Sequence, residues 1–284
     1  MNNRNIIISA DCTCDFPEEM LDEYSIITIP FYIMVNDARF QEGTEVSSEM
    51  LVDIFEKSDD KISSAPASVE EYRDYFLNNS DNGKNELIHI SVSSAFSGAY
   101  ANAVEAAREM KNVHIFDSHL FSHATGLLLI TASKLVKSGM SVEGIINELT
   151  KERHKISCSF ALKTTRYAAK NNRVGPTTSY LLDLFKVKPV IKINRNVLEV
   201  AGLCLSNVKH HARNYIRKTI KNSKKISDGV LFITVSGCSE EFKQFIYDEA
   251  TKNIAWKKVY VQEVSATNFC NLGPESFGLM FRTK

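Results

Sequence analysis

The chain has 284 residues, a length that favours two domains over one. Its 34 basic and 34 acidic residues give a formal net charge of zero, which excludes the strong positive field that nucleic acids and anionic membranes attract. The longest apolar stretch, residues 124–132, is well short of the ~20 residues that a bilayer span requires. We therefore expect a soluble protein with no nucleic-acid partner and no membrane-spanning segment.

The amino terminus and the cysteines predict a cytoplasmic protein. The apolar run at residues 6–8 is too short for a secretory signal, and six cysteines scattered along the chain suit a reducing compartment. Cys12 and Cys14 form the only close pair. No CxxC pattern or second ligand pair accompanies them, so ordinary thiols are favoured over a metal or redox site. We expect neither a metal nor a cofactor.

The first half of the chain alternates short apolar runs with amphipathic stretches, which is typical of βαβ units around a mainly parallel sheet. Strands are predicted at residues 5–10, 26–34, 87–92 and 113–116. Capping boxes predict two helix starts, at Asp15 with Glu18 and at Ser68 with Glu71. A third helix is predicted after Gly98, where apolar residues recur at helical spacing.

From about Lys155 the pattern changes to alternating apolar and polar residues, as in a strand with one polar face. Further strands are predicted at residues 189–193, 197–204, 230–235 and 258–264, with a helix at 239–251. Asn194-Arg195-Asn196 is good chemistry for a hairpin turn. The sequence thus predicts an α/β protein of two domains. Residues 1–154 form a mainly parallel α/β domain, and residues 155–284 an α+β domain with a mixed or antiparallel sheet.

Four turns are candidates for a binding site, because ligands of open α/β sheets lie beyond the carboxyl ends of the strands. They are residues 11–15, 63–66, 93–98 and 117–118. The turn from Ser93 to Gly98 joins an apolar strand to a helix start. Hydroxyls and unpaired N–H groups should converge there at the positive end of the helix dipole, which suits a carboxylate or phosphate. The alternative is that these serines only cap the helix, and the same holds for Ser63 and Ser64.

Other polar residues allow two interpretations each. Asp11 and Asp15 could form a carboxylate pair for a metal or for acid–base chemistry, but turn and cap roles are favoured because no third ligand accompanies them. His119 and His123 have half of a zinc-site spacing on a predicted helix, and surface or core histidines are favoured. Arg173 lies in a predicted loop, where it would meet an anion or a partner protein or remain solvated. The GxSxG, GxGxxG and GxxxxGK[ST] motifs are absent, which argues against common hydrolases, dehydrogenases and P-loop kinases.

The ordered turns resemble those of the DegV family of bacterial fatty-acid-binding proteins along essentially the whole chain. The most specific match is the family segment Ser-Ser-x-Leu-Ser-Gly-Thr-Tyr, which resembles residues 93–100. The other matches are Asp-Ser-Thr-Ala-Asp with residues 11–15, Thr-Ser-Gln-Pro with 63–66, Asp-Ser with 117–118, Gly-Gly-Arg with 171–173, Lys-Pro with 188–189 and His-x-Gly-Pro-Gly with 271–275.

This resemblance implies a long-chain fatty acid in an apolar tunnel of the first domain, with its carboxylate at the domain interface. The implied ligand-binding residues are Ser63, Ser64, Ser93, Ser94, Ser97, Gly98 and Asn271. The family also implies a separate fatty acid kinase as partner, which phosphorylates the bound acid. Arg173, in its predicted loop, is the candidate partner contact. A protein of this kind is a carrier without catalytic residues.

The chain departs from the family pattern at three polar positions. Ala65 stands where the family has Gln, Ala99 where it has Thr, and Asn271 where it has His. An asparagine can donate a hydrogen bond but cannot become cationic.

Two alternatives to a carrier follow from the residues. One is a serine-dependent acyl-transfer enzyme that uses Ser94 or Ser97, against which stands the lack of a nearby histidine in the sequence. The other is a regulator that senses an anionic metabolite by closing its two domains.

Overall fold

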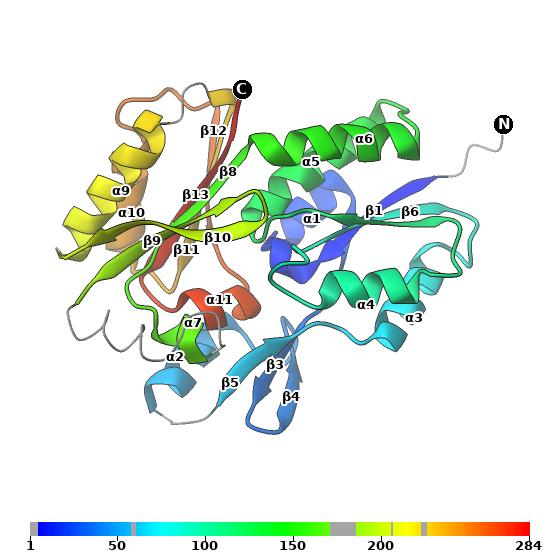
Figure 1. Ribbon diagram of the computed structural model, residues 1–284, viewed down its shortest axis with the longest axis horizontal. Coiled ribbons are helices and arrows are strands. Elements are labelled where there is room, and N and C mark those ends of the chain that lie inside the picture. The colour runs from blue at the N-terminus through cyan, green and yellow to red at the C-terminus, as the bar shows by residue number, and fades with distance from the viewer. Residues whose placement is uncertain (1–4, 58–60, 171–185, 206, 223–225) are drawn as a thin grey trace. The chain divides into compact units, whose positions relative to one another are not determined.

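The computed structural model describes residues 5–57, 61–170, 186–205, 207–222 and 226–284 (Figure 1). Contacts divide the chain into two compact units. The first unit contains two segments, the residues up to Tyr32 and Ala65–His154. The second unit contains Ile33–Ser64 and Lys155–Lys284. Arg173, the predicted partner contact, lies outside the described residues.

The first unit is built on a four-stranded parallel sheet with the order β2-β1-β6-β7. Its strands are β1 (Ile6–Asp11), β2 (Ile26–Ile29), β6 (Glu86–Ser91) and β7 (Val113–Asp117). The predicted parallel sheet is therefore confirmed. The predicted strand at 26–34 is wrong in one respect: it is two strands, because Pro30 cannot donate a ladder hydrogen bond.

Helices cover both faces of this sheet, with α3 and α4 on one face and α5 on the other (Figure 1). The helices and the short 3-10 helix of this unit are η1 (Cys12–Cys14), α1 (Glu18–Tyr24), α3 (Val69–Asn79), α4 (Ala99–Ala106), α5 (His123–Lys137) and α6 (Val142–Glu152). One core cluster joins Tyr72 and Phe76 of α3 to Ala103 of α4 and Leu87 of β6. Burial of these side chains contributes about 1.5–3 kcal/mol for each large one.

One of the two predicted capping boxes is present. The Ser68 hydroxyl accepts from the Glu71 N–H, and the Glu71 carboxylate accepts from the Ser68 N–H at 2.6 Å. The box at Asp15 is wrong, because Asp15 ends η1 in a left-handed conformation (φ 61°) and Pro17 precedes α1. The Asp15 carboxylate instead accepts a hydrogen bond from the Ser122 hydroxyl at 2.5 Å. A tertiary contact thus replaces the expected local one.

The second unit is built on a six-stranded mixed sheet with the order β10-β9-β8-β13-β11-β12, in which only β11 and β12 pair in parallel. Its strands are β8 (Ile156–Ala161), β9 (Lys188–Asn194), β10 (Val197–Cys204), β11 (Ile226–Ser236), β12 (Lys258–Glu263) and β13 (Ser276–Thr283). The predicted mixed sheet is confirmed. The central strand β13 was not predicted.

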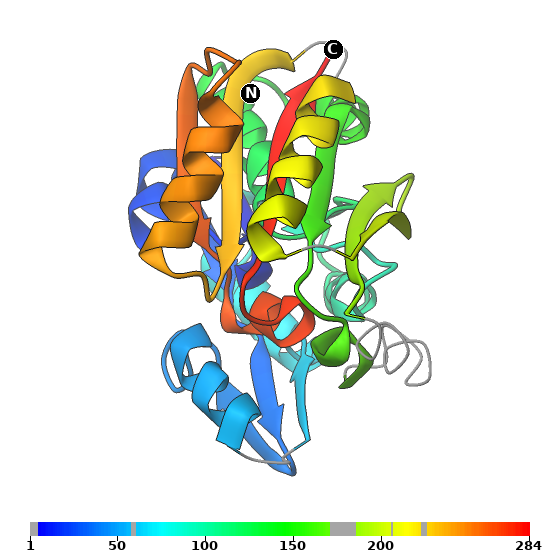
Figure 2. The same cartoon turned by 90° about the vertical axis from the view of Figure 1, so that its left-hand side faces the viewer.

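Two helices, α9 (Val208–Asn222) and α10 (Glu240–Thr251), lie side by side on one face of this sheet (Figure 2). Their buried side chains, such as Ile216 and Ile246, form one core cluster with Phe277 of β13. The β9–β10 hairpin turns at Arg195 and Asn196, both with positive φ, as the turn chemistry predicts.

Residues 33–64, which the sequence assigns to the amino-terminal domain, instead group with the second unit. Here lie β4 (Ala38–Gln41) and α2 (Ser48–Lys57), with β3 (Tyr32–Val35) and β5 (Ile62–Ala65) at the two boundaries. Glu42 accepts hydrogen bonds from the N–H (3.0 Å) and hydroxyl (2.6 Å) of Thr267 at the start of α11 (Ala266–Leu272). Phe55 packs edge-on against Tyr167 of α7 (Arg166–Lys170).

Within the described ranges, no helix is long and apolar enough to cross a membrane.

Candidate functional site

Three turns of the first unit meet at the carboxyl edge of its parallel sheet. The Ser93 N–H donates to the Leu120 carbonyl (2.9 Å), and the Ser94 N–H donates to the Asp117 carboxylate (3.2 Å). The Ser122 N–H donates to the Thr13 carbonyl (3.0 Å). These bonds join the turns that follow β1, β6 and β7. Three of the four candidate turns thus share one edge, whereas residues 63–65 lie on β5, which belongs to a different sheet, β4-β3-β5.

The serines of the Ser93–Gly98 turn have local hydrogen-bond partners. The buried Ser93 hydroxyl accepts from the Ala95 N–H (3.0 Å), and the Ser97 hydroxyl accepts from the Ala99 N–H (3.2 Å). Ser94 is exposed. The hydroxyls of Ser93 and Ser97 shape the turn by accepting these bonds, and ligand binding by the same hydroxyls stays a prediction.

Gly98 leaves the start of α4 open. It occupies the N-cap position with an ordinary helical φ of −72° and offers no side chain to cap the first turn. A methyl group built on Gly98 would meet no heavy atom within 4 Å. Glycine is thus not required there by backbone strain or by packing. Gly98 is exposed, so an anion can approach the positive end of the α4 dipole from solvent.

Asp11 holds the strand end that leads into this turn. Its carboxylate, 1 % exposed, accepts from the Ser91 hydroxyl (2.9 Å) and the Val92 N–H (2.8 Å), and also from the Tyr72 hydroxyl. The His89 Nε2 atom lies 3.3 Å from it. Burial alone would raise the pKa of Asp11, but His89, Tyr72 and the Val92 N–H together hold that pKa below its ordinary 3.8. Asp11 is a structural anion, but its predicted turn or cap role is wrong: its side chain makes no cap bond to η1 and instead bonds to residues that are distant in the sequence.

Ser9, His89 and Asp11 have the residue types of a catalytic triad, but no substrate can reach them. The Ser9 hydroxyl lies 2.9 Å from His89 Nδ1 and 2.9 Å from the Tyr75 hydroxyl. Ser9 and His89 are completely buried. A nucleophile must be accessible to the substrate, so this trio stabilises the core instead of catalysing. Among the described residues, no histidine bonds to Ser94 or Ser97.

The other predicted ligand-binding residues lie in the second unit. Ser63 and Ser64 are half-buried on β5. Asn271 lies on α11, where its amide nitrogen donates to the Thr267 carbonyl at 2.9 Å. Its amide oxygen is buried and has no partner among the described residues. The sequence analysis placed Ser63, Ser64 and Asn271 in one site with residues 93–98. In the structure the first three belong to the second unit and residues 93–98 to the first.

The structure shows no metal site in the part of the chain that it describes. The predicted pair of histidines does not share a helix, because His119 has a positive φ and precedes α5, which begins at His123. His123 is completely buried, and burial lowers its pKa to about 3.

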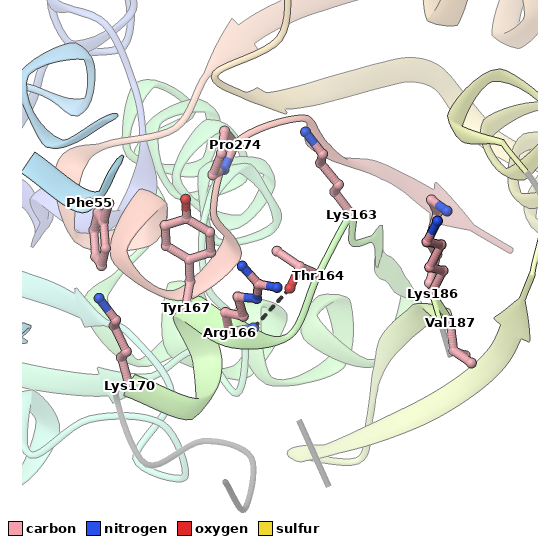
Figure 3. A pocket seen from close by; sticks show the side chains of 10 residues that line it. Phe55, Lys163, Thr164, Arg166, Tyr167, Lys170, Lys186, Val187 and Pro274 are labelled. Carbon is pink, nitrogen blue, oxygen red and sulfur yellow. Dashed lines mark hydrogen bonds between the residues drawn. The ribbon is translucent and has the colours of Figure 1, made fainter. Parts of the chain in front are cut away.

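The second unit contains a basic pocket that sequence reasoning missed (Figure 3). Its volume is about 820 Å³, and its lining residues are Phe55, Lys163, Thr164, Arg166, Tyr167, Lys170, Lys186, Val187, Lys188 and Pro274. Lys163 pairs with Glu275 at 2.7 Å, and Lys170 lies over the Phe55 ring. The sequence did carry a pattern for this pocket: Lys163, Arg166, Tyr167 and Lys170 have the i, i+3, i+4 and i+7 spacing of residues that share one side of a helix. Five cationic side chains favour an anionic ligand or partner here.

A family model described as an uncharacterised protein of the DegV family matches residues 5–284. The chain is 23% identical to a DegV domain-containing protein of Clostridium perfringens over 282 residues, which cover 97% of this chain and 98% of that protein. It is 28% identical to a DegV domain-containing protein of Staphylococcus aureus over 215 residues, 75% of this chain and 76% of the relative.

Solved structures of the same fold include proteins that are described as fatty acid binding. A DegV family protein from Thermus thermophilus, titled for fatty acid binding, matches with a TM-score of 0.85 at 20% identity, covering 99% of this chain and 100% of that one. DegV of Bacillus subtilis, titled a fatty acid binding protein, matches with a TM-score of 0.82 at 21% identity and the same coverage. A stearic acid-binding protein from Eubacterium ventriosum matches with a TM-score of 0.84 at 18% identity, covering 97% of each chain. These likenesses show the fold.

Proposed function

Because this chain belongs to the DegV family, we propose that it binds a long-chain fatty acid, with the carboxylate at the open start of α4 and the alkyl chain in an apolar tunnel of the first unit. The observation that carries this proposal is the exposed start of α4 at Gly98, which lies where three polar turns meet. The fatty acids named for the structural neighbours support it. Transfer of each CH₂ of the chain out of water contributes about 0.8 kcal/mol.

The acid would be presented to a separate fatty acid kinase, as the family resemblance implies. The basic pocket beside α7 supports a partner of acidic surface, since complementary charge speeds association and orients the two proteins. In this role the protein is a carrier, and no residue of it is catalytic. Buried Ser9 and exposed Ser94, neither placed to act as an activated nucleophile, support a carrier over an acyl-transfer enzyme. Six cysteines without disulfides suit the predicted cytoplasmic location.

Native mass spectrometry of the purified protein, followed by lipid extraction, tests the binding. We expect a co-purifying mass of an ordinary fatty acid. Added palmitate or oleate should raise the melting temperature of lipid-free protein, because a ligand at 100 times its Kd stabilises by ~2.7 kcal/mol. An empty protein with no melting shift would rule the proposal out.

Substitutions at Gly98 test where the carboxylate lies. Gly98→Ala and Gly98→Val should fold normally, because the position has a helical φ and open space around it. If the carboxylate approaches this backbone, the added methyl groups will weaken palmitate binding in steps, by about tenfold or more for valine. Isothermal titration calorimetry measures the change. Ala255→Val, at an exposed position of the second unit, is the control and should bind as the parent does. Unchanged binding by Gly98→Val would place the carboxylate elsewhere.

A further inference from the structure

A second cavity, of about 500 Å³, lies within the second unit and is lined by residues of the sheet, of α9 and of the β9–β10 hairpin. It is lined by three parts of the unit. The sheet contributes Ser157, Ser159 and Thr283, the hairpin contributes residues of β9 and β10, and α9 contributes five polar side chains. None of the basic-pocket residues lines it. The two cavities are therefore separate sites.

Helix α9 has two inward faces, and only one of them is apolar. The apolar face packs into the core of the unit through Val208, Ala212, Ile216 and Ile220. The second face follows the spacing i, i+3, i+4, i+7 and i+8 and lines the cavity with His211, Asn214, Tyr215, Lys218 and Thr219. Along this second face His211 and Tyr215 are buried, Asn214 and Thr219 are half-buried and Lys218 is exposed.

The strands β8 and β9 present polar side chains to the cavity from neighbouring positions of the sheet. Ser159 of β8 is paired with Lys192 of β9, so both side chains lie on the cavity side of the sheet. Tyr215 fixes the helix to this floor: its hydroxyl donates to the Ser159 carbonyl (2.6 Å) and accepts from the Leu279 N–H (3.1 Å). Two hydrogen bonds thus connect this wall of the cavity to the sheet.

Several polar groups of the cavity have no partner among the described residues. His211 is 4 % exposed, and its Nε2 atom bonds to nothing. Neither the Asn214 amide nor the Lys218 ammonium has a hydrogen bond or ion pair. Of these three groups only His211 is buried, whereas Asn214 is half-buried and Lys218 is exposed. Buried polar groups in native proteins nearly always have partners, so the His211 Nε2 atom is the one that a ligand would satisfy.

The charge of the lining favours an anion. Among the described lining residues are Lys192 and Lys218 and no acidic side chain. Glu199, from the neighbouring strand, already pairs with Lys192 at 3.2 Å. Burial and the nearby Lys188 lower the pKa of His211 to about 4, so its imidazole is neutral and can donate one hydrogen bond.

We propose that this cavity binds a small polyhydroxylated organic anion, of the sugar-phosphate or sugar-acid class. Lys218 and His211 would bind the anionic group, and the hydroxyls and the Asn214 amide would bind the polyol. A volume of about 500 Å³ exceeds what an inorganic ion fills and falls within the range of small-molecule sites. The fatty acid proposal rests on the first unit, so this site stands or falls independently.

Calorimetric titration of the full chain with glucose 6-phosphate and with gluconate tests the proposal, with glucose and sulfate at matched ionic strength as controls. We expect saturable binding of at least one of the two sugar anions and none of glucose or sulfate. Binding of glucose 6-phosphate alone assigns a phosphate, and binding of gluconate alone assigns a carboxylate. Failure of both would overturn the proposal.

Two variants locate the binding. Lys218→Met removes an exposed cation and should weaken binding about tenfold, as expected for one charge-assisted hydrogen bond. Lys221→Met, exposed on the same helix but away from the cavity, is the matched control. Gly202→Val should fold, because the nearest atom to its new Cβ is that of Val190, 4.0 Å away, and should weaken binding by narrowing the cavity. Binding that is unchanged in Gly202→Val and Lys218→Met would overturn the assignment.

Discussion

Replacement of Asp11 by alanine is expected to lower the free energy of unfolding by about 3–5 kcal/mol, because it removes one partner of a fully buried charged network. The Ser91 hydroxyl, the Val92 N–H and the Tyr72 hydroxyl would all lose their acceptor. Each would remain buried, and each unsatisfied group carries a desolvation cost. The loss is a large fraction of the stability of an ordinary domain.

Urea unfolding followed by circular dichroism measures this effect. Asp22→Ala is the matched control, because Asp22 is exposed on α1 and should change stability by less than about 0.5 kcal/mol. A loss below about 1 kcal/mol for Asp11→Ala would show that the network relaxes around the gap. The same substitution should weaken palmitate binding if the turn after Val92 forms the binding site, since Asp11 positions that turn.

The pH dependence of stability should carry the signature of Asp11. Its pKa is lowered in the folded protein, so the folded state releases the proton more readily than the unfolded chain. The stabilisation is therefore complete above the unfolded value of about 4 and is lost as the pH falls through the lower folded pKa. In Asp11→Asn the free energy of unfolding should fall less steeply as the pH is lowered below about 4, because the titrating carboxyl is gone. In Asp22→Asn it should fall as it does in the parent. The same fall in unfolding free energy at low pH in the parent and in Asp11→Asn would contradict this role of Asp11.

Gly278→Ala should destabilise the second unit by about 3 kcal/mol or more, because the central strand β13 leaves no room for a methyl group. A Cβ on Gly278 would lie 2.6 Å from the ring of Phe160, its partner across β8, and 2.8 Å from the Ser159 carbonyl oxygen. Phe160 is 1 % exposed, so its ring has nowhere to move. The carbonyl is part of the sheet and cannot move without breaking the ladder.

Thermal unfolding compares this variant with Gly202→Ala. Both glycines lie in strands of the same sheet and neither has a positive φ, but Gly202 has no heavy atom closer than 4.0 Å to a new Cβ. We expect a drop in melting temperature for Gly278→Ala and little change for Gly202→Ala. Equal melting temperatures would mean that β8 and β13 can separate at low cost.

Local patterns were enough to predict much of this protein. Apolar runs followed by polar turns predicted β1, β6 and β7 and the edge at which their turns meet. The Ser68–Glu71 capping box and the turn at Arg195 and Asn196 were also readable, because each is a contact between residues a few positions apart. Interactions of short sequence separation leave a pattern that is read without the fold.

Only the tertiary structure decided the features that depend on distant residues. Asp15 bonds to Ser122 instead of capping α1, and Glu42 bonds to Thr267 and draws residues 33–64 into the second unit. The same holds for the candidate sites. The sequence singled out the Ser93–Gly98 turn, but only the fold showed that its serines have local partners and that the start of α4 at Gly98 is open. The polar face of α9 becomes a cavity wall only when the β9–β10 hairpin lies beside it, because a cavity is a property of packing and not of any one segment.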